Sequence, residues 1–117
     1  MLTNSQKATY EEWLRLVNMT DDELQEYYDS PLGQKSGLSR LAAKSLSIKS
    51  GRESARNIIK MKQVPPEQWT EDEWEWANRQ IRFIKRMRGV QGPLMDGKGG
   101  LTRKAMSLYI WGHNPLK

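Results

Sequence analysis

Apolar side chains recur at every third or fourth position through several stretches of the chain, the spacing that gives a helix one apolar face. The first stretch covers residues 5–18, where this face comprises Tyr10, Trp13, Leu14 and Val17. The pattern predicts an amphipathic helix over residues 5–18 that packs against another part of the fold.

The longest stretch covers residues 70–88 and has the widest apolar face. Its members are Trp74, Ala77, Ile81 and Ile84 at helical spacing, with Trp76, Phe83 and Met87 widening the face. A face this broad needs apolar partners on more than one side. We therefore expect a helix over residues 70–88 at the centre of the fold.

Both ends of this central helix carry boundary signals. Thr70 and Glu73 have the spacing of a capping box, in which each side chain accepts a hydrogen bond from the other residue's backbone N–H. Gly89 suits the left-handed conformation that often follows a helix end. Acidic residues occupy the first turns, where the positive end of the helix dipole favours them: Glu71, Asp72, Glu73 and Glu75. We attribute these carboxylates to helix formation rather than to acid–base catalysis or Mg²⁺ binding.

A short helix is predicted after residue 20. Thr20 and Glu23 repeat the capping-box spacing, and the apolar residues that follow are Leu24, Tyr27 and Tyr28. Turn-forming residues are dense in residues 30–37, which favours a connection there. This connection separates an acidic N-terminal helical segment, residues 1–35, from a basic helical core, residues 36–117.

The basic core begins with two predicted helices. A short one with little apolar bulk covers residues 38–48, and a longer one over residues 51–63 has Ser50 as its cap. Pro65 and Pro66 then force a turn, because proline lacks the N–H that a helix needs and restricts the residue before it.

The last predicted helix covers residues 103–111, with Thr102 as its cap and Gly112 at its end. Residues 94–97 precede it and have the composition of a small hairpin. Together these elements predict an all-α protein, a compact single domain of five or six short helices around the central amphipathic helix 70–88.

The composition narrows the function classes. The chain has 117 residues, no cysteine and one histidine, so a disulfide framework or a thiolate metal site is excluded and we expect neither a metal nor a cofactor. No apolar run approaches the length of about 20 residues that spans a bilayer, and the first residues lack a signal-peptide core. We therefore expect a soluble protein with no membrane partner.

The charge is unevenly distributed along the chain. Residues 1–34 hold seven acidic and two basic residues, whereas residues 35–117 hold seven acidic and 17 basic residues. Two interpretations fit this asymmetry. Either the acidic segment folds onto the basic core, or the core binds a polyanion while the acidic segment faces elsewhere.

Basic residues at helical spacing form candidate binding stripes. They are Arg52, Arg56 and Lys60 on one predicted helix, Arg79, Arg82 and Arg86 on the central helix, and Arg103 and Lys104 on the last helix. The planar guanidinium of arginine binds phosphate oxygens in pairs, so DNA or RNA is a natural partner if these stripes converge. The alternative is that the stripes are solvated faces or pair with nearby carboxylates.

His113 is the only candidate for catalysis near neutral pH. It follows the last predicted helix, where capping of that helix end is the favoured role. An enzymatic alternative places His113 and Asn114 beside Arg103 and Lys104, acting on a phosphodiester. The glycine-rich residues 96–102 lack the spacing of a phosphate-binding loop, although their N–H groups could hold an anion.

The second half of the chain resembles a small uncharacterised domain family found in bacteriophage and other viral genomes. The resemblance covers residues 36–115 and rests on the motifs Ser50-Gly51-Arg52, Trp74-Glu75-Trp76-Ala77, Arg86-Met87-Arg88-Gly89, Thr102-Arg103-Lys104 and Ile110-Trp111-Gly112-His113-Asn114-Pro115. It implies a viral context, with the host cytoplasm or the virion as location, and no settled activity.

Two functions follow as hypotheses. The leading one is a non-enzymatic nucleic-acid-binding protein that contacts phosphates through its arginine-rich helix faces. The alternative is a protein-interaction module, either a virion component or a viral protein that binds a host protein, in which the acidic segment and exposed aromatic residues form the interface.

Overall fold

A computed structural model describes residues 1–31, 51–90, 92–95, 97 and 100–116, which contain five α-helices and one 3-10 helix. The elements are α1 (Asn4–Leu16), α2 (Asp21–Asp29), α5 (Gly51–Lys62), η1 (Pro66–Gln68), α6 (Glu71–Gly89) and α7 (Arg103–Ile110). The prediction of an all-α fold is confirmed. The predicted helix 38–48, the cap at Ser50 and most of the connection 30–37 lie outside the described residues.

Threonine caps begin four of these helices. Thr20 with Glu23 and Thr70 with Glu73 form the predicted capping boxes of α2 and α6. Thr3 with Gln6 forms a third box at α1, and the Thr102 hydroxyl accepts a hydrogen bond from the Ala105 N–H at α7. Each cap satisfies backbone donors that the helix cannot satisfy itself, so these starts are fixed locally.

The end of α6 differs from the prediction. Gly89 is the last residue of the helix and does not adopt a positive φ. The chain instead leaves through Val90, which has an extended conformation with φ −71° and ψ 129° and whose N–H bonds to the Met87 carbonyl. The helix therefore ends without needing a glycine in the left-handed region.

The end of α7 matches the prediction and forms a Schellman motif. Gly112 has φ +82°, and its N–H bonds to the Tyr109 carbonyl while the His113 N–H bonds to the Leu108 carbonyl, both at 2.9 Å. These two bonds satisfy carbonyls that the helix leaves free.

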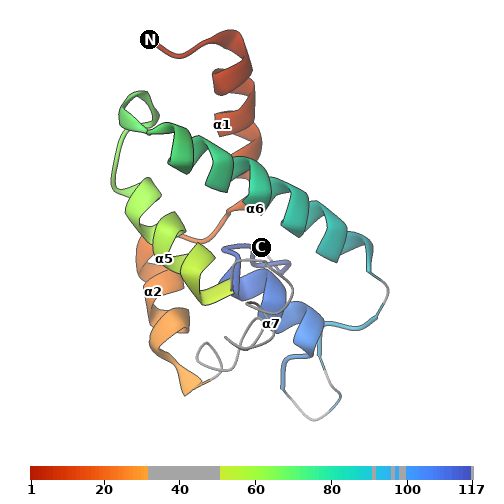
Figure 1. Ribbon diagram of the computed structural model, residues 1–117. Coiled ribbons are helices and arrows are strands. Elements are labelled where there is room, and N and C mark those ends of the chain that lie inside the picture. The colour runs from red at the N-terminus through yellow and green to blue at the C-terminus, as the bar shows by residue number, and fades with distance from the viewer. Residues whose placement is uncertain (32–50, 91, 96, 98–99, 117) are drawn as a thin grey trace, which may run out of the picture.

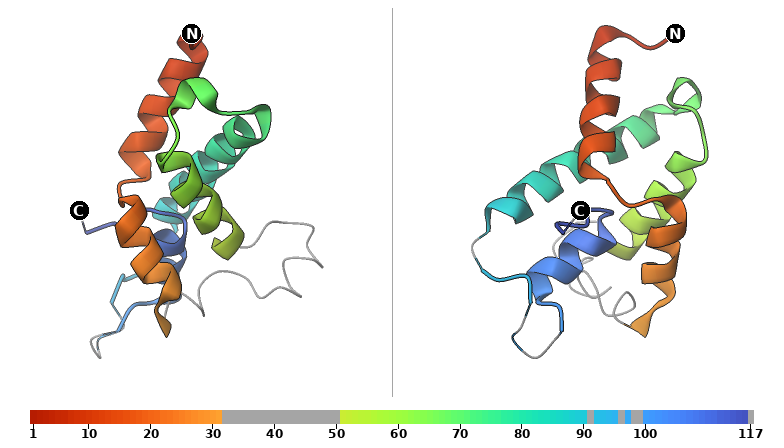
Figure 2. Two further views of the ribbon diagram at one scale, coloured as in Figure 1. Left: turned by 90° about the vertical axis from the view of Figure 1, so that its left-hand side faces the viewer. Right: turned by 180° about the vertical axis from the view of Figure 1, so that it is seen from behind.

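The helices form two groups that pack face to face. Figure 2 shows α1 and α2 on one side of the molecule and α5 and α6 on the other. Helix α6 contacts α1, α5 and α7, while α2 packs on α5 and α7. The predicted central position of the 70–88 helix is thus confirmed, and Figure 1 shows α6 crossing α1.

One hydrophobic cluster joins these helices. Its fully buried members include Trp13, Leu24, Ile58, Ile84 and Leu108, one from each of the five α-helices. Trp69 lies among the aromatic residues at the α1 side, with its ring centroid 5.1 Å from that of Trp13 and 4.8 Å from that of Trp74.

A buried chain of polar groups crosses this cluster. The Trp13 indole N–H donates to Gln80 Oε1 at 2.7 Å, and Gln80 Nε2 donates to the Ser54 hydroxyl at 3.2 Å. Both Gln80 and Ser54 are fully buried. Because an unpaired polar group in such a place is costly, this chain fixes how α1, α5 and α6 pack together.

Candidate nucleic-acid interface

The basic stripe of α6 lies on the outer face of that helix. Arg82 and Arg86 are exposed and Arg79 is half-buried, whereas Ala77 and Ile84 on the opposite face are fully buried. Arg82 and Arg86 form no hydrogen bond or ion pair with the described residues. The spacing prediction that these three arginines share one face is confirmed.

The stripe of α5 is divided between two roles. Arg56 and Lys60 are exposed on the face opposite the buried Ser54 and Ile58. Arg52 instead binds α2: its guanidinium donates to the Tyr28 carbonyl at 3.0 Å and lies 3.8 Å from the centre of the Tyr28 ring. Arg52 therefore helps to hold α2 against α5.

Helices α5 and α6 lie on the same side of the molecule, and each carries basic residues on its outer face. Both helices lie on one side in Figure 2, and their buried faces contact the helices on the other. The basic residues of both helices lie opposite their buried faces. We call this set of residues the basic face and define it as Arg56, Lys60, Arg79, Arg82 and Arg86.

The two basic residues of α7 do not join the basic face in the same way. Lys104 donates to the Val90 carbonyl at 2.6 Å, so its ammonium group ties the start of α7 to the end of α6. Arg103 is exposed at the first position of α7. Of the eight predicted residues, Arg52 and Lys104 thus have internal partners within the fold.

Two further lysines outside the predicted set bind other groups of the fold. Lys62 donates to the Val17 carbonyl at 2.9 Å, just beyond the end of α1. Lys85 forms an ion pair with Glu12 of α1 at 2.6 Å. That lysine and Arg15 lower the pKa of the Glu12 carboxyl by hydrogen bonding to it.

The acidic helix α2 leaves the basic face open. It packs on α5, yet its Asp22 and Glu26 side chains remain exposed. Helix α6 has no acidic residue between Trp76 and Gly89. The acidic segment folds onto the basic core, as the first interpretation of the charge asymmetry expected, without covering Arg56, Lys60, Arg82 or Arg86.

Aromatic rings accompany two arginines of the basic face. The Arg79 guanidinium lies 5.1 Å from the centre of the Trp76 ring, and that of Arg86 lies 6.0 Å from the centre of the Phe83 ring. Such contacts between a cation and a ring orient the arginines along the helix. The hydrophobic pattern placed Trp76 and Phe83 at the edge of the apolar face, and their spacing of three residues from an arginine indicated these pairs.

His113 is buried and has a structural role. The residue is only 6% exposed, and its Nδ1 lies 2.6 Å from the Leu16 carbonyl oxygen. Burial lowers the pKa of the imidazole, against the opposing effect of the bond to Leu16. His113 therefore caps the end of α1, whereas the prediction had its side chain cap α7.

The arrangement does not assemble the phosphodiester site considered from the sequence. Asn114 is bonded to Asn18 by its N–H at 2.8 Å and by its carbonyl at 3.1 Å. Arg103 and Lys104 begin α7, while His113 follows its end. Within the described residues, no group of three or more acidic or histidine side chains is placed to hold a metal ion.

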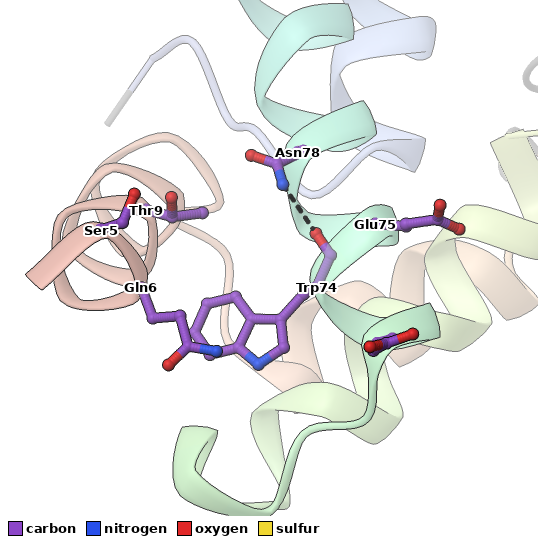
Figure 3. A pocket seen from close by; sticks show the side chains of 7 residues that line it. Ser5, Gln6, Thr9, Trp74, Glu75 and Asn78 are labelled. Carbon is purple, nitrogen blue, oxygen red and sulfur yellow. Dashed lines mark hydrogen bonds between the residues drawn. The ribbon is translucent and has the colours of Figure 1, made fainter. Parts of the chain in front are cut away.

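A shallow groove lies between α1 and the start of α6 (Figure 3). Trp74 faces the Gln6 amide across it, as Figure 3 shows, and the groove is also lined by Ser5, Thr9, Glu71, Glu75 and Asn78. Its two carboxylates oppose the approach of phosphates. The groove is therefore separate from the basic face in its chemistry.

Comparison with known proteins identifies a family whose function is unknown. A family described as "Protein of unknown function (DUF3140)" matches residues 12–109. No curated protein and no solved structure matches the chain. Among the described helices, none combines the length and the apolar character that crossing a lipid bilayer requires.

Proposed function

Since the chain belongs to the DUF3140 family, whose description names no activity, we propose from its geometry that it is a non-enzymatic nucleic-acid-binding protein. The basic face would contact phosphates, with Arg82 and Arg86 as its main contacts. Arg103 adds a further exposed cation at the start of α7.

The supporting observation is that Arg82 and Arg86 are exposed on one face of α6 and form no hydrogen bond or ion pair with the described residues. Several other cations of the fold do have carbonyl or carboxylate partners: Lys62, Lys85 and Lys104. A surface ion pair contributes little to stability in any case. Apart from the contact of Arg86 with the Phe83 ring, no interaction with the described residues accounts for these two arginines, and an external anionic partner would account for both.

The physical basis is the release of counterions. A polyanion concentrates cations along its phosphates, and a protein that neutralises those phosphates releases the cations into solution. Arginine is well suited because its fork binds two phosphate oxygens at once. Contacts of this kind fix the position of the ligand but do not select a base sequence.

Titration of labelled DNA and RNA tests the proposal. We expect replacement of Arg82 and Arg86 by Gln to weaken binding by about tenfold or more at low salt. The matched control replaces Lys7 and Arg15 on α1, which changes the net charge equally on the other side of the molecule. Equal losses in the two double variants would show that only overall charge matters and would overturn the proposal.

A viral setting, which the resemblance of the sequence implies, is an additional expectation. The family description that matches the chain names neither an organism nor a location. The proposal for the basic face does not depend on it.

A protein-interaction module is the second candidate. The observation that favours it is the exposed acidic surface of α2, which includes Asp22 and Glu26. All ten aromatic residues are described and each is at least half-buried, so the acidic side chains of α2 would form most of such an interface. A pull-down from nuclease-treated lysate separates the candidates, because a protein partner survives the treatment and a partner bridged by nucleic acid does not.

A further inference from the structure

Trp76 differs from the other four tryptophans of the chain. All five are described, and Trp13, Trp69, Trp74 and Trp111 each stack on or abut another aromatic ring. Trp76 makes no such contact. Its indole N–H also has no acceptor among the described residues. A tryptophan with an open N–H beside charged groups is typical of a binding surface.

The position of Trp76 connects it to the basic face. Trp74 and Lys85 lie on the flank of α6 that faces α1, as the groove with Gln6 and the ion pair with Glu12 show. The helical spacing places Trp76 and Phe83 on the other flank. Phe83 there stacks on Trp111, with ring centroids 4.1 Å apart.

Rings and guanidiniums consequently alternate along the edge of the basic face. The order along α6 is Trp76, Arg79, Phe83 and Arg86, and each arginine lies over the ring that precedes it. One face of Phe83 is occupied by Trp111. Trp76 has no aromatic ring stacked on it; it is partly buried against the hydrophobic cluster, and the Arg79 guanidinium lies over it. A base would therefore reach this ring by displacing that guanidinium.

The alternation of rings and guanidiniums favours single-stranded over double-stranded nucleic acid. In a duplex the bases are stacked on one another, so a protein ring on a helix face cannot stack on them without opening the helix. In a single strand the bases are free, and proteins bind them with a cationic groove for the backbone and aromatic side chains for the bases. The cation–π contact of Arg79 joins two half-buried residues at 5.1 Å, and a base that stacks on this side of the ring takes its place.

Resting on the proposed function, we infer that the ligand class is single-stranded nucleic acid. A base stacks on Trp76, while Arg79, Arg82 and Arg86 bind the phosphates that flank it. The chemistry is shared by DNA and RNA strands, because stacking and phosphate contact require no 2′-hydroxyl group.

Binding of short strands and duplexes to the full chain tests the inference. The probes are oligo-dT and oligo-U strands of roughly 15 nucleotides, within the site sizes of single-strand binders, and the duplex of the same dT strand with oligo-dA. The variants are Trp76→Leu, which keeps apolar bulk, and Trp76→Phe, which keeps a ring. The thermal unfolding of both variants is measured alongside, so that loss of fold is recognised.

We expect tighter binding to the strands than to the duplex. Trp76→Leu should weaken strand binding by about tenfold, and Trp76→Phe should restore most of it. A preference for oligo-dT or oligo-U then identifies DNA or RNA as the source of the strand.

Two results would overturn the inference and leave the basic face intact: equal or tighter binding of the duplex, or identical strand affinities for the wild type, Trp76→Leu and Trp76→Phe. If Trp76→Leu does not fold, the comparison of Trp76→Phe and the wild type across strand and duplex still decides the preference. Wild-type binding of every probe no tighter than that of the Arg82 and Arg86 double variant would instead refute the proposed function itself.

Discussion

The Nδ1 atom of His113 lies 2.6 Å from the carbonyl oxygen of Leu16, 97 residues away in the sequence. Because a carbonyl only accepts, the imidazole carries its proton on Nδ1. The same region is held by the Met19 N–H, which bonds to the Gly112 carbonyl at 3.2 Å, and by Lys62 at Val17. The end of the chain thus closes the connection between α1 and α2.

Stability should depend on the ionisation of His113. Burial holds the imidazole pKa below its ordinary value of 6.5, so the unfolded chain binds a proton more readily than the folded one. The stability that the neutral imidazole of His113 contributes is therefore complete above the pKa of the unfolded chain, and it decreases as the pH falls below that value. We expect the free energy of unfolding in urea to decrease between about pH 7 and pH 5.

The variant His113→Gln provides the control for this titration. It removes the ionisable group, and it should flatten the pH dependence in this range while costing about 2 kcal/mol through the lost bond to Leu16. Glu12 also titrates with a lowered pKa, but its effect appears below its ordinary value of 4.5. An equally steep dependence in His113→Gln would assign the titration to other groups.

The buried chain of polar groups should be sensitive to Gln80. The variant Gln80→Leu retains the volume but leaves the Trp13 N–H and the Ser54 hydroxyl without their partner, so we expect a loss of about 2 kcal/mol in the free energy of unfolding. Asn78→Ala removes an exposed amide of the same helix, which bonds only to the Trp74 carbonyl, and should cost less than about 0.5 kcal/mol. Similar losses in both variants would argue against a special role for the buried chain.

Two glycines should respond to alanine in opposite directions. At Gly112, φ is +82° and an added Cβ would lie 2.8 Å from Val17 Cγ1, so Gly112→Ala should cost about 2 kcal/mol or more. At Gly89 the conformation is helical, and apart from its chain neighbours and the nearby backbone of its own helix no described atom lies within 4 Å of an added Cβ. Gly89→Ala should therefore stabilise the protein by about 0.5 kcal/mol. Thermal unfolding measures both, and a stable Gly112→Ala would contradict the packing of Val17 on this turn.

The salt dependence of the binding affinity should report how many phosphates the protein contacts. Each contact contributes a slope of about 0.7 for single strands when the logarithm of affinity is plotted against that of salt. Replacing both Arg82 and Arg86 should lower the slope by about 1.4. An unchanged slope in this double variant would mean that these arginines do not touch phosphates.

The helix boundaries are the part of this fold that the sequence determines by itself. Thr20, Thr70 and Thr102 cap their helices as predicted, because a cap needs only a side-chain oxygen within three residues of a free N–H. Gly112 likewise ends α7 as predicted, with the positive φ that glycine adopts readily. Gly89 fitted the same rule and was assigned wrongly, since a helix can also end in an extended residue such as Val90.

The tertiary structure alone decided which charges remain free. Arg52, Lys62, Lys85 and Lys104 look like Arg82 and Arg86 in the sequence, yet each binds an atom that packing brings close: the carbonyls of Tyr28, Val17 and Val90 and the carboxylate of Glu12. Likewise His113 found its acceptor at the end of another helix. Helix signals act over a few residues, whereas these pairings depend on how whole helices pack, which no local pattern encodes.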